Sequence, residues 1–349
     1  MSTRLSLPFA DWPAADRVAW QAATEAGDLF DGSGPAAGWA PSTRAGVCYD
    51  YGRWLMFLAR HEPAMLDQPL ALRPTPERLC TYLDHLAATV GSVGRHGYLR
   101  HLADALRVMA PSQDWAWLRR VVARLEAQRR PRPKPPRLVE AGRLVELGYA
   151  LMQTAERRLD EAENDTTALL DYRDGLMIAL LAARPLRRRN LAMITIGRQL
   201  IRVGDAWHLV FAAEETKTGQ PIEVILPDRL VPYLERYLRA IRPRFPGADR
   251  HAGLWAGLKG RAITGQAIYD AITQRTRVAF GHAVNPHLFR DCAATTIAIT
   301  APDRIGVARD LLGHASLATT EQYYNQASSI DASRLLARVL EQRRTALAE

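Results

Sequence analysis

Residues 129–137, RRPRPKPPR, constrain the fold of this chain more than any other segment. They comprise five basic residues, four prolines and no acid. Proline lacks the backbone N–H that helices and sheets use, and proline-rich chain is extended and semi-rigid. We therefore predict a stiff, exposed linker over residues 128–138, with a domain on each side. Its charge fits two uses, which are solubility and a strap that lies along nucleic-acid phosphates.

The length of the chain agrees with two domains, and its charge indicates the kind of partner. A chain of 349 residues exceeds what one hydrophobic core usually supports, so two domains are expected. The formal net charge of +9 favours a polyanionic partner such as nucleic acid or an anionic membrane surface.

Several classes of protein are not expected. The longest apolar run, residues 176–183, is far too short to span a membrane, and Asp11 interrupts what would be a secretory signal. Three scattered cysteines form neither a disulfide framework nor a zinc site, so we expect a cytoplasmic protein with reduced thiols.

The region before the linker divides into two parts. Residues 1–39 are expected to form an irregular N-terminal arm, because glycine and proline crowd positions 32–41. Residues 40–127 show helical periodicity with start signals at Ser42, at Thr75 followed by Pro76, and at Ser112. They are predicted to form a small all-helical domain.

Residues 139–349 read as a mainly helical domain with a small antiparallel β-sheet insertion. Asp165 precedes a helix that runs to about residue 181. Residues 207–212 and 221–226 read as two strands, joined by a hairpin in which Gly219 supplies the turn. Further helices are expected at 228–242, 264–279, 286–299, 303–312, 317–326 and 331–346, the last one arginine-rich.

Four features of this region could carry chemistry. They are an arginine cluster at 184–189, Lys217 in the hairpin, His287 and Arg290 on one face of a helix opened by Asn285-Pro286, and a Leu-Gly-His followed by paired tyrosines. Each alone has a plainer structural explanation, such as a solvated helix end or an exposed turn lysine. No metal-ligand spacing, phosphate loop or dinucleotide fingerprint is present in the sequence.

The order of these features resembles the tyrosine recombinase (phage integrase) family over about residues 175–326. The resemblance implies an N-terminal helical core-binding domain, which contacts DNA, and a C-terminal catalytic domain. By position, the catalytic residues would be Arg187, Lys217, His287, Arg290 and His314. The nucleophile would be Tyr324, because Tyr-Asn-x-Ala follows the spacing of one family variant, with Tyr323 as the alternative. The family often has an acid three residues after the first arginine, where this chain has Asn190.

The family reaction is transesterification at a DNA phosphodiester through a 3′-phosphotyrosine. The resemblance implies that Arg187 and Arg290 hold the phosphate oxygens, His287 acts as the base, Lys217 as the acid, and His314 hydrogen-bonds the phosphate. It implies no metal and no cofactor, because the covalent bond stores the ester energy. The expected function is a site-specific recombinase or integrase, which would serve a mobile element or chromosome resolution.

The expected partners are double-stranded DNA and further copies of the chain, a dimer to a tetramer on DNA, with no membrane partner. The residues 331–346 could dock onto a neighbouring copy or pack on their own domain. The alternatives are a catalytically silent DNA-binding protein of the same fold and a strand-relaxing enzyme of type IB topoisomerase character. The candidate DNA contacts are the basic residues of the linker and cluster, Arg129, Arg130, Arg132, Lys134, Arg137, Arg188 and Arg189.

Overall fold

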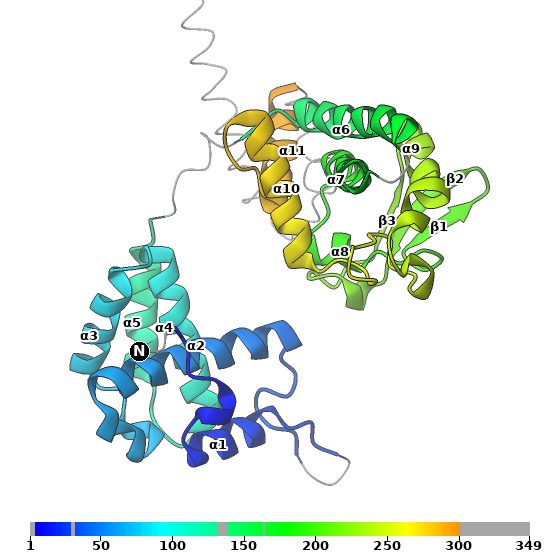
Figure 1. The fold of residues 1–349 in the computed structure, drawn as a ribbon. Coiled ribbons are helices and arrows are strands. Elements are labelled where there is room, and N and C mark those ends of the chain that lie inside the picture. Colours follow the sequence, from blue (N-terminus) through cyan, green and yellow to red (C-terminus); the bar gives the residue numbers. More distant parts are fainter. Residues whose placement is uncertain (1–3, 29–31, 131–137, 163–164, 301–349) are drawn as a thin grey trace, which may run out of the picture. The chain divides into compact units, whose positions relative to one another are not determined.

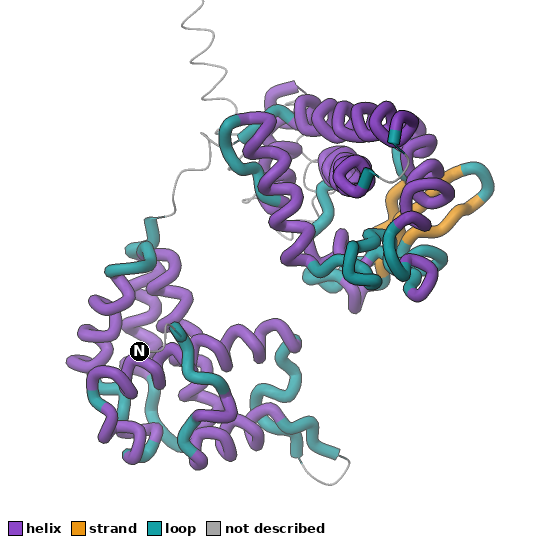
Figure 2. The backbone as a smooth tube through the Cα atoms, in the orientation of Figure 1, coloured by secondary structure: helices purple, strands orange, loops and turns teal. Residues whose placement is uncertain are grey.

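The computed structural model describes residues 4–28, 32–130, 138–162 and 165–300. The chain divides into two compact units, Met1–Pro133 and Lys134–Glu349. The first unit is helical, and the second is helical with a three-stranded sheet (Figures 1 and 2). The predicted fold class, mainly helical with a small antiparallel sheet, is confirmed. Among the described residues, no helix has the length and apolar character needed to cross a membrane.

The first unit is built on a core rich in aromatic side chains. Its helices are α1 (Ala14–Thr24), α2 (Pro41–His61), α3 (Pro76–Ala87), α4 (Ser92–Met109) and α5 (Ala116–Ala127). Thr75 caps α3 as the sequence indicates, because its side chain accepts a hydrogen bond from the backbone N–H of Arg78. α4 packs against both α2 and α5. Large side chains fill the space between the helices, among them Trp12, Trp20, Tyr51, Trp54, Leu99 and Leu106.

The irregular arm predicted for residues 1–39 is wrong for a large part of that segment. Residues 14–24 form α1, and Trp20 lies in the core. Asp16 is fully buried, where its carboxylate pairs with the Arg73 guanidinium at 2.6 Å and accepts a hydrogen bond from the Tyr51 hydroxyl at 2.8 Å. A buried charge is tolerated only with such partners. Because the partners lie 35 and 57 residues away in the sequence, they give no local signal.

The second unit is organised around α7 (Thr166–Ala183), which is buried along nearly its whole length. Figure 1 shows α7 end-on, with other elements on every side of it. Asp165 caps it, as expected, by accepting a hydrogen bond from the N–H of Ala168 at 3.0 Å. The surrounding helices are α6 (Ala141–Glu161), α8 (Arg188–Met193), α9 (Val231–Arg236), α10 (Gly265–Phe280) and α11 (Pro286–Thr300).

Two glycines allow α6 and α7 to pack closely. A Cβ on Gly148 of α6 would lie 2.7 Å from the Gly175 carbonyl oxygen and 2.7 Å from the Ala179 Cβ. A Cβ on Gly175 would lie 2.7 Å from the Gly148 carbonyl oxygen. Real Cβ atoms do not approach other atoms this closely, so the two backbones meet because both residues lack a side chain.

An ionic network ties three helices together around α7. Asp171 pairs with Arg158 of α6 at 2.9 Å and with Arg275 of α10 at 2.6 Å. Asp174 pairs with the same Arg275 at 3.1 Å and with Arg173 at 2.7 Å. Both carboxylates and Arg173 are buried, and each carboxylate has two guanidinium partners. Such mutual pairing offsets the cost of removing these charges from water.

The sheet consists of β1 (Leu200–Val203), β2 (Ala206–Phe211) and β3 (Ile222–Ile225) in that order, with both pairs antiparallel. β2 and β3 confirm the two predicted strands. β1 was not predicted. Gly219 has a φ of +66° in the turn between β2 and β3, which glycine adopts without strain.

The helices predicted after the sheet have three outcomes. Thr264 caps α10 and Asn285 opens α11, both at the predicted positions. The single helix expected at 228–242 is divided into a 3₁₀ turn (Asp228–Leu230), α9 and a π-helical turn (Tyr237–Ile241). The helices expected at 303–312, 317–326 and 331–346 lie outside the described residues.

We expect Gly148→Ala to destabilise the second unit by about 1–3 kcal/mol, because the new methyl group clashes with α7. Gly142→Ala is the matched control on the same helix, since its Cβ would meet only the Glu140 carboxylate, at 3.6 Å. That change should be neutral or stabilising by up to about 1 kcal/mol. Chemical denaturation measures both effects. Equal unfolding midpoints for the two variants would contradict the close packing.

Candidate active site

The arginine cluster lies where the buried helix α7 ends. The chain leaves α7 after Ala183, passes through the buried Leu186 and enters α8 with Arg187 as its N-cap residue. The Arg187 carbonyl accepts the first hydrogen bond of that helix, from the N–H of Leu191 at 3.0 Å. The Arg187 side chain is partly buried, which lowers the pKa of its guanidinium, although an arginine stays charged at neutral pH.

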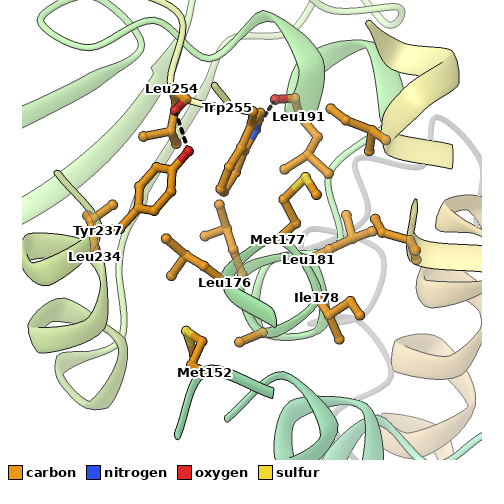
Figure 3. Packing of buried hydrophobic residues seen from close by; sticks show 14 of the residues in the cluster. Met152, Leu176, Met177, Ile178, Leu181, Leu191, Leu234, Tyr237, Leu254 and Trp255 are labelled. Atoms are coloured by element: carbon orange, nitrogen blue, oxygen red, sulfur yellow. Dashed lines mark hydrogen bonds between the residues drawn. The ribbon is translucent and has the colours of Figure 1, made fainter. Parts of the chain in front are cut away.

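A buried tryptophan attaches α8 to the core of the unit. Trp255 donates a hydrogen bond from its ring nitrogen to the Leu191 carbonyl at 2.8 Å, and the side chain is 1% exposed. Figure 3 shows this bond beside a second one, from the Tyr237 hydroxyl to the Leu254 carbonyl. Met177 and Leu181 of α7 belong to the same packed cluster. The position of Arg187 is therefore fixed from both sides, by α7 before it and by α8 after it.

α11 presents His287 and Arg290 from its first turns. The Asn285 side chain accepts hydrogen bonds from the N–H groups of His287 at 3.0 Å and of Leu288 at 3.2 Å, and Pro286 follows as the first helical residue. Arg290 donates a hydrogen bond from Nη1 to the Pro185 carbonyl at 2.6 Å. This bond joins α11 to the loop that carries Arg187. Its two partners, Pro185 and Arg290, lie 105 residues apart in the sequence.

His287 lies among cations. Its pKa is lowered below the usual 6.5, first by partial desolvation and then by the charges of Arg188, Arg290 and Lys217, while Asp291 acts in the opposite direction. Coulomb interactions weaken with distance, so this influence indicates that the three cations lie near the ring. The ring itself remains accessible at the surface. A lowered pKa means that the imidazole is mainly neutral at pH 7, and a neutral imidazole can accept a proton.

The neighbours of Arg187 are held differently from it. Arg188 is half-buried, and its guanidinium lies over the Tyr269 ring of α10 at 5.7 Å. Arg189 is exposed. Arg188 and Arg189 were both predicted to contact DNA, and that role stays a prediction for each.

Lys217 is exposed on the tight turn of the hairpin. The Thr216 hydroxyl donates to the Gln220 carbonyl at 2.8 Å and so closes this turn. The base of the turn is attached to α8, because Asn190 donates a hydrogen bond from Nδ2 to the Glu215 carbonyl at 3.1 Å. Sequence reasoning did not find this link, since a hydrogen bond from a side chain to a distant carbonyl leaves no mark on a spacing pattern.

Arg290 is thus bonded to the loop of Arg187, and the charges of Lys217 and Arg290 both act on the pKa of His287. His314, Tyr323 and Tyr324 lie outside the described residues. Of the predicted linker contacts, Arg129 pairs with Glu126 at 2.9 Å, and the Arg130 backbone N–H donates to the Ser92 hydroxyl at 2.9 Å. Arg132, Lys134 and Arg137 also lie outside the described residues.

Comparison with known proteins identifies the family. The sequence model of the phage integrase family matches residues 150–329, which is just over half of the chain. The chain belongs to the phage integrase family. The match includes the end of α6, all of α7 and the segments that carry every predicted catalytic residue.

Curated relatives of this phage integrase family chain are bacterial tyrosine recombinases. It is similar to the tyrosine recombinase XerD of Pseudomonas aeruginosa, with 32% identity over 155 residues, which are 44% of this chain and 50% of that protein. The similarity to XerD of Staphylococcus saprophyticus is 27% over 176 residues, which are 48% of this chain and 57% of the relative. The chain thus spans about half the length of the curated relatives it matches.

Solved structures with a similar fold also come from recombinases. The XerH site-specific recombinase bound to difH substrate, in a pre-cleavage complex, aligns with a TM-score of 0.53 and 16% identity over 83% of this chain and 78% of that one. A lambda integrase dimer bound to a COC′ core site aligns with a TM-score of 0.50 and 15% identity over 83% of this chain and 90% of that one. At this identity the likeness establishes the fold of the phage integrase family and nothing further.

We expect the pKa of His287 in the free protein to lie below 6.5, and we expect Arg188→Gln to raise it, because Arg188 is the strongest cationic influence on the ring. Arg189→Gln is the matched control from the next position of α8, since Arg189 is exposed and is not among the groups that shift this pKa. A titration of the histidine ring signals by NMR measures all three proteins. An unchanged value in Arg188→Gln would contradict the arrangement.

Proposed function

We propose that this protein is a site-specific DNA recombinase that cuts and rejoins DNA through a 3′-phosphotyrosine intermediate. The proposal is carried by the bond that holds Arg290 to the loop of Arg187, together with the lowering of the His287 pKa by the charges of Arg188, Arg290 and Lys217. Several cations around one neutral imidazole suit an anionic substrate that must also lose a proton. Membership of the phage integrase family supports DNA as that substrate.

In the proposed reaction, the two arginines stabilise charge. Attack on a phosphodiester adds negative charge to the non-bridging oxygens in the transition state, and a guanidinium can contact two such oxygens at once. Arg187 and Arg290 take this role. The backbone of Arg187 is fixed by its place between α7 and α8, and the guanidinium of Arg290 is held by its bond to Pro185. Preorganised charges of this kind need no rearrangement as the reaction proceeds.

Two proton transfers accompany the exchange of bonds. The tyrosine oxygen forms a bond to phosphorus, and its proton passes to His287, which is mainly neutral at pH 7. The bond from phosphorus to the 5′-oxygen breaks, and Lys217 gives that oxygen a proton. Tyr324 is the proposed nucleophile, with Tyr323 as the alternative, and His314 hydrogen-bonds the phosphate. One ester replaces another, so a second 5′-hydroxyl can reverse the step and rejoin the strand without added energy.

Recombination joins strands from two duplexes, so the proposal includes several copies of the chain on DNA, from a dimer to a tetramer. Arg129, Arg130, Arg132, Lys134, Arg137, Arg188 and Arg189 are proposed to contact the DNA backbone. The ion pair of Arg129 with Glu126 is exposed and therefore weak, so a phosphate can compete for this arginine. We propose that the recombination serves a mobile element, with chromosome resolution as the alternative.

Covalent trapping on DNA tests the proposal. The chain first selects its binding site from a pool of random duplexes, and a nicked duplex is built on that site so that the cleaved end cannot rejoin. A DNA–protein adduct that survives denaturation, followed by joining to a second duplex, is the expected result. Tight binding without any adduct would indicate a silent DNA-binding protein. An adduct with plasmid relaxation but no joining between sites would indicate a strand-relaxing enzyme.

We expect Tyr324→Phe to abolish the covalent adduct and Tyr323→Phe to retain it, because only the nucleophile's oxygen can form the ester. Each variant loses one hydroxyl and keeps its ring, so the pair controls for packing. Denaturing electrophoresis of the trapped complex measures both. The reverse pattern would transfer the role to Tyr323, and adducts in both variants would refute a nucleophile at either position.

We expect Arg290→Ala and Lys217→Ala to slow single-turnover cleavage by about 10²–10³-fold and to keep DNA binding, because the first removes a preorganised charge from the transition state and the second removes the proton donor of the departing oxygen. Arg290→Lys should recover only part of the loss, since an ammonium group lacks the fork of a guanidinium. Gel-shift titration reports binding and the nicked duplex reports cleavage. Wild-type cleavage in either alanine variant would remove that residue from the mechanism.

A further inference from the structure

The side chain of Asn190 connects two parts of the candidate active site. It is 2% exposed and lies on α8, three residues after Arg187. Its Nδ2 donates a hydrogen bond to the backbone carbonyl of Glu215, 25 residues further along the chain, at 3.1 Å. Glu215 is two residues before Lys217. A buried amide that bonds a loop carbonyl resists movement, because breaking the bond leaves the Asn190 amide unpaired away from water.

The loop that Asn190 contacts is itself stiff. The Glu215 carboxylate accepts hydrogen bonds from the Ala212 N–H at 3.0 Å and from the Gln199 side chain at 2.8 Å. The buried Thr216 donates from its hydroxyl to the Gln220 carbonyl. These bonds span the loop from residue 212 to residue 220. We therefore expect the turn that carries Lys217 to move together with the Glu215 carbonyl.

We propose that Asn190 is a positioning residue that holds the hairpin, and with it Lys217, at a fixed place relative to Arg187. This inference rests on the proposed function, because it assigns Asn190 the alignment of the proton donor with the departing oxygen. Asn190 acts through the loop and touches neither substrate nor reacting atoms. An error of about 1 Å in the placement of a catalytic group can cost about 10²-fold in rate.

The polarity of this contact accounts for an amide at position 190. A carbonyl oxygen needs a donor, and asparagine supplies an N–H that an ionised aspartate lacks. Asn190→Asp would turn two acceptors toward each other in a buried place. The change that brings the chain closer to the common family pattern is therefore expected to damage this protein, unless the carboxylate turns to Arg187 instead. A damaged Asn190→Asp variant supports a role of Asn190 in holding the loop. An undamaged one indicates that position 190 acts directly on Arg187.

Hydrogen exchange of the full chain tests the contact without any need for activity. We expect Asn190→Leu and Asn190→Asp to raise the amide exchange rates of residues 213–219 by at least about tenfold, because the loop loses its bond to α8. Arg198→Ala is the matched control, since Arg198 also pairs with Glu215, at 2.7 Å, but from a side chain that is 74% exposed. It should leave the loop unchanged. Unchanged exchange in both position-190 variants would overturn the inference.

The chemistry is tested with a substrate whose scissile 5′-oxygen is replaced by sulfur. A thiolate leaves without a proton donor, because a thiol is far more acidic than an alcohol. On the oxygen ester, we expect Asn190→Leu to cleave about 10²-fold slower than wild type, in the same direction as Lys217→Ala. On the sulfur ester, both should return to within about tenfold of wild type, whereas Arg187→Ala should not recover.

Three results would refute the positioning role. They are wild-type cleavage of the oxygen ester by Asn190→Leu, an equal defect on both esters, and wild-type behaviour of Asn190→Asp. A second donor variant, Asn190→Ser, covers the event that the leucine variant does not fold, and it should lie between wild type and Asn190→Asp. If the wild-type chain forms no adduct with either ester, the proposed function fails, and hydrogen exchange still decides whether Asn190 holds the loop.

Discussion

The contact between Gly148 and Gly175 determines how the second unit is built. Because neither residue has a side chain, α6 can lie directly on α7, and α7 becomes an interior helix with neighbours on all sides. A helix enclosed in this way cannot shift or tilt without disturbing several partners at once. Its last turn therefore provides a fixed starting point for the loop that carries Arg187, and α8 continues from that point to Asn190.

Ion pairs of Asp171 and Asp174 fix the orientation of α7 further than close packing alone. Hydrophobic contacts alone permit a helix to rotate or slide by small amounts, whereas Asp171 and Asp174 must each meet guanidinium groups. Arg275 bridges both carboxylates from α10, and Arg158 reaches Asp171 from α6. A rotation of α7 would disturb these pairs together. The network fixes α6, α7 and α10 relative to one another. The position of the site depends on α7.

Local signals predicted the parts of the fold that depend on neighbouring residues. The caps Thr75 and Asp165 marked helix starts, and Gly219 marked the hairpin turn. The failures have physical causes that act over longer distances. α1 is stabilised by partners of Asp16 that are remote in sequence, and the glycines in the segment that follows it suggested irregular chain. α4 has two glycines in its first turns and no side-chain cap, so its start has no signature.

The same distinction applies to the candidate site. The order of Arg187, Lys217, His287 and Arg290 in the sequence selected these residues as candidates, because their spacing resembles a family pattern. Their supports could not be found in this way. Asn190, Trp255 and the Pro185 carbonyl act through contacts between segments that only folding brings together.

The bond from Arg290 to the Pro185 carbonyl has an entropic consequence. A free arginine side chain samples many rotamers, and freezing them costs up to about 2 kcal/mol. Here the cost is met when the chain folds, since Nη1 is already tied to the backbone. A guanidinium carries its five N–H donors in one plane, and the bond to Pro185 restrains the direction of that plane. An anion that reaches this plane encounters a side chain with little freedom left to lose.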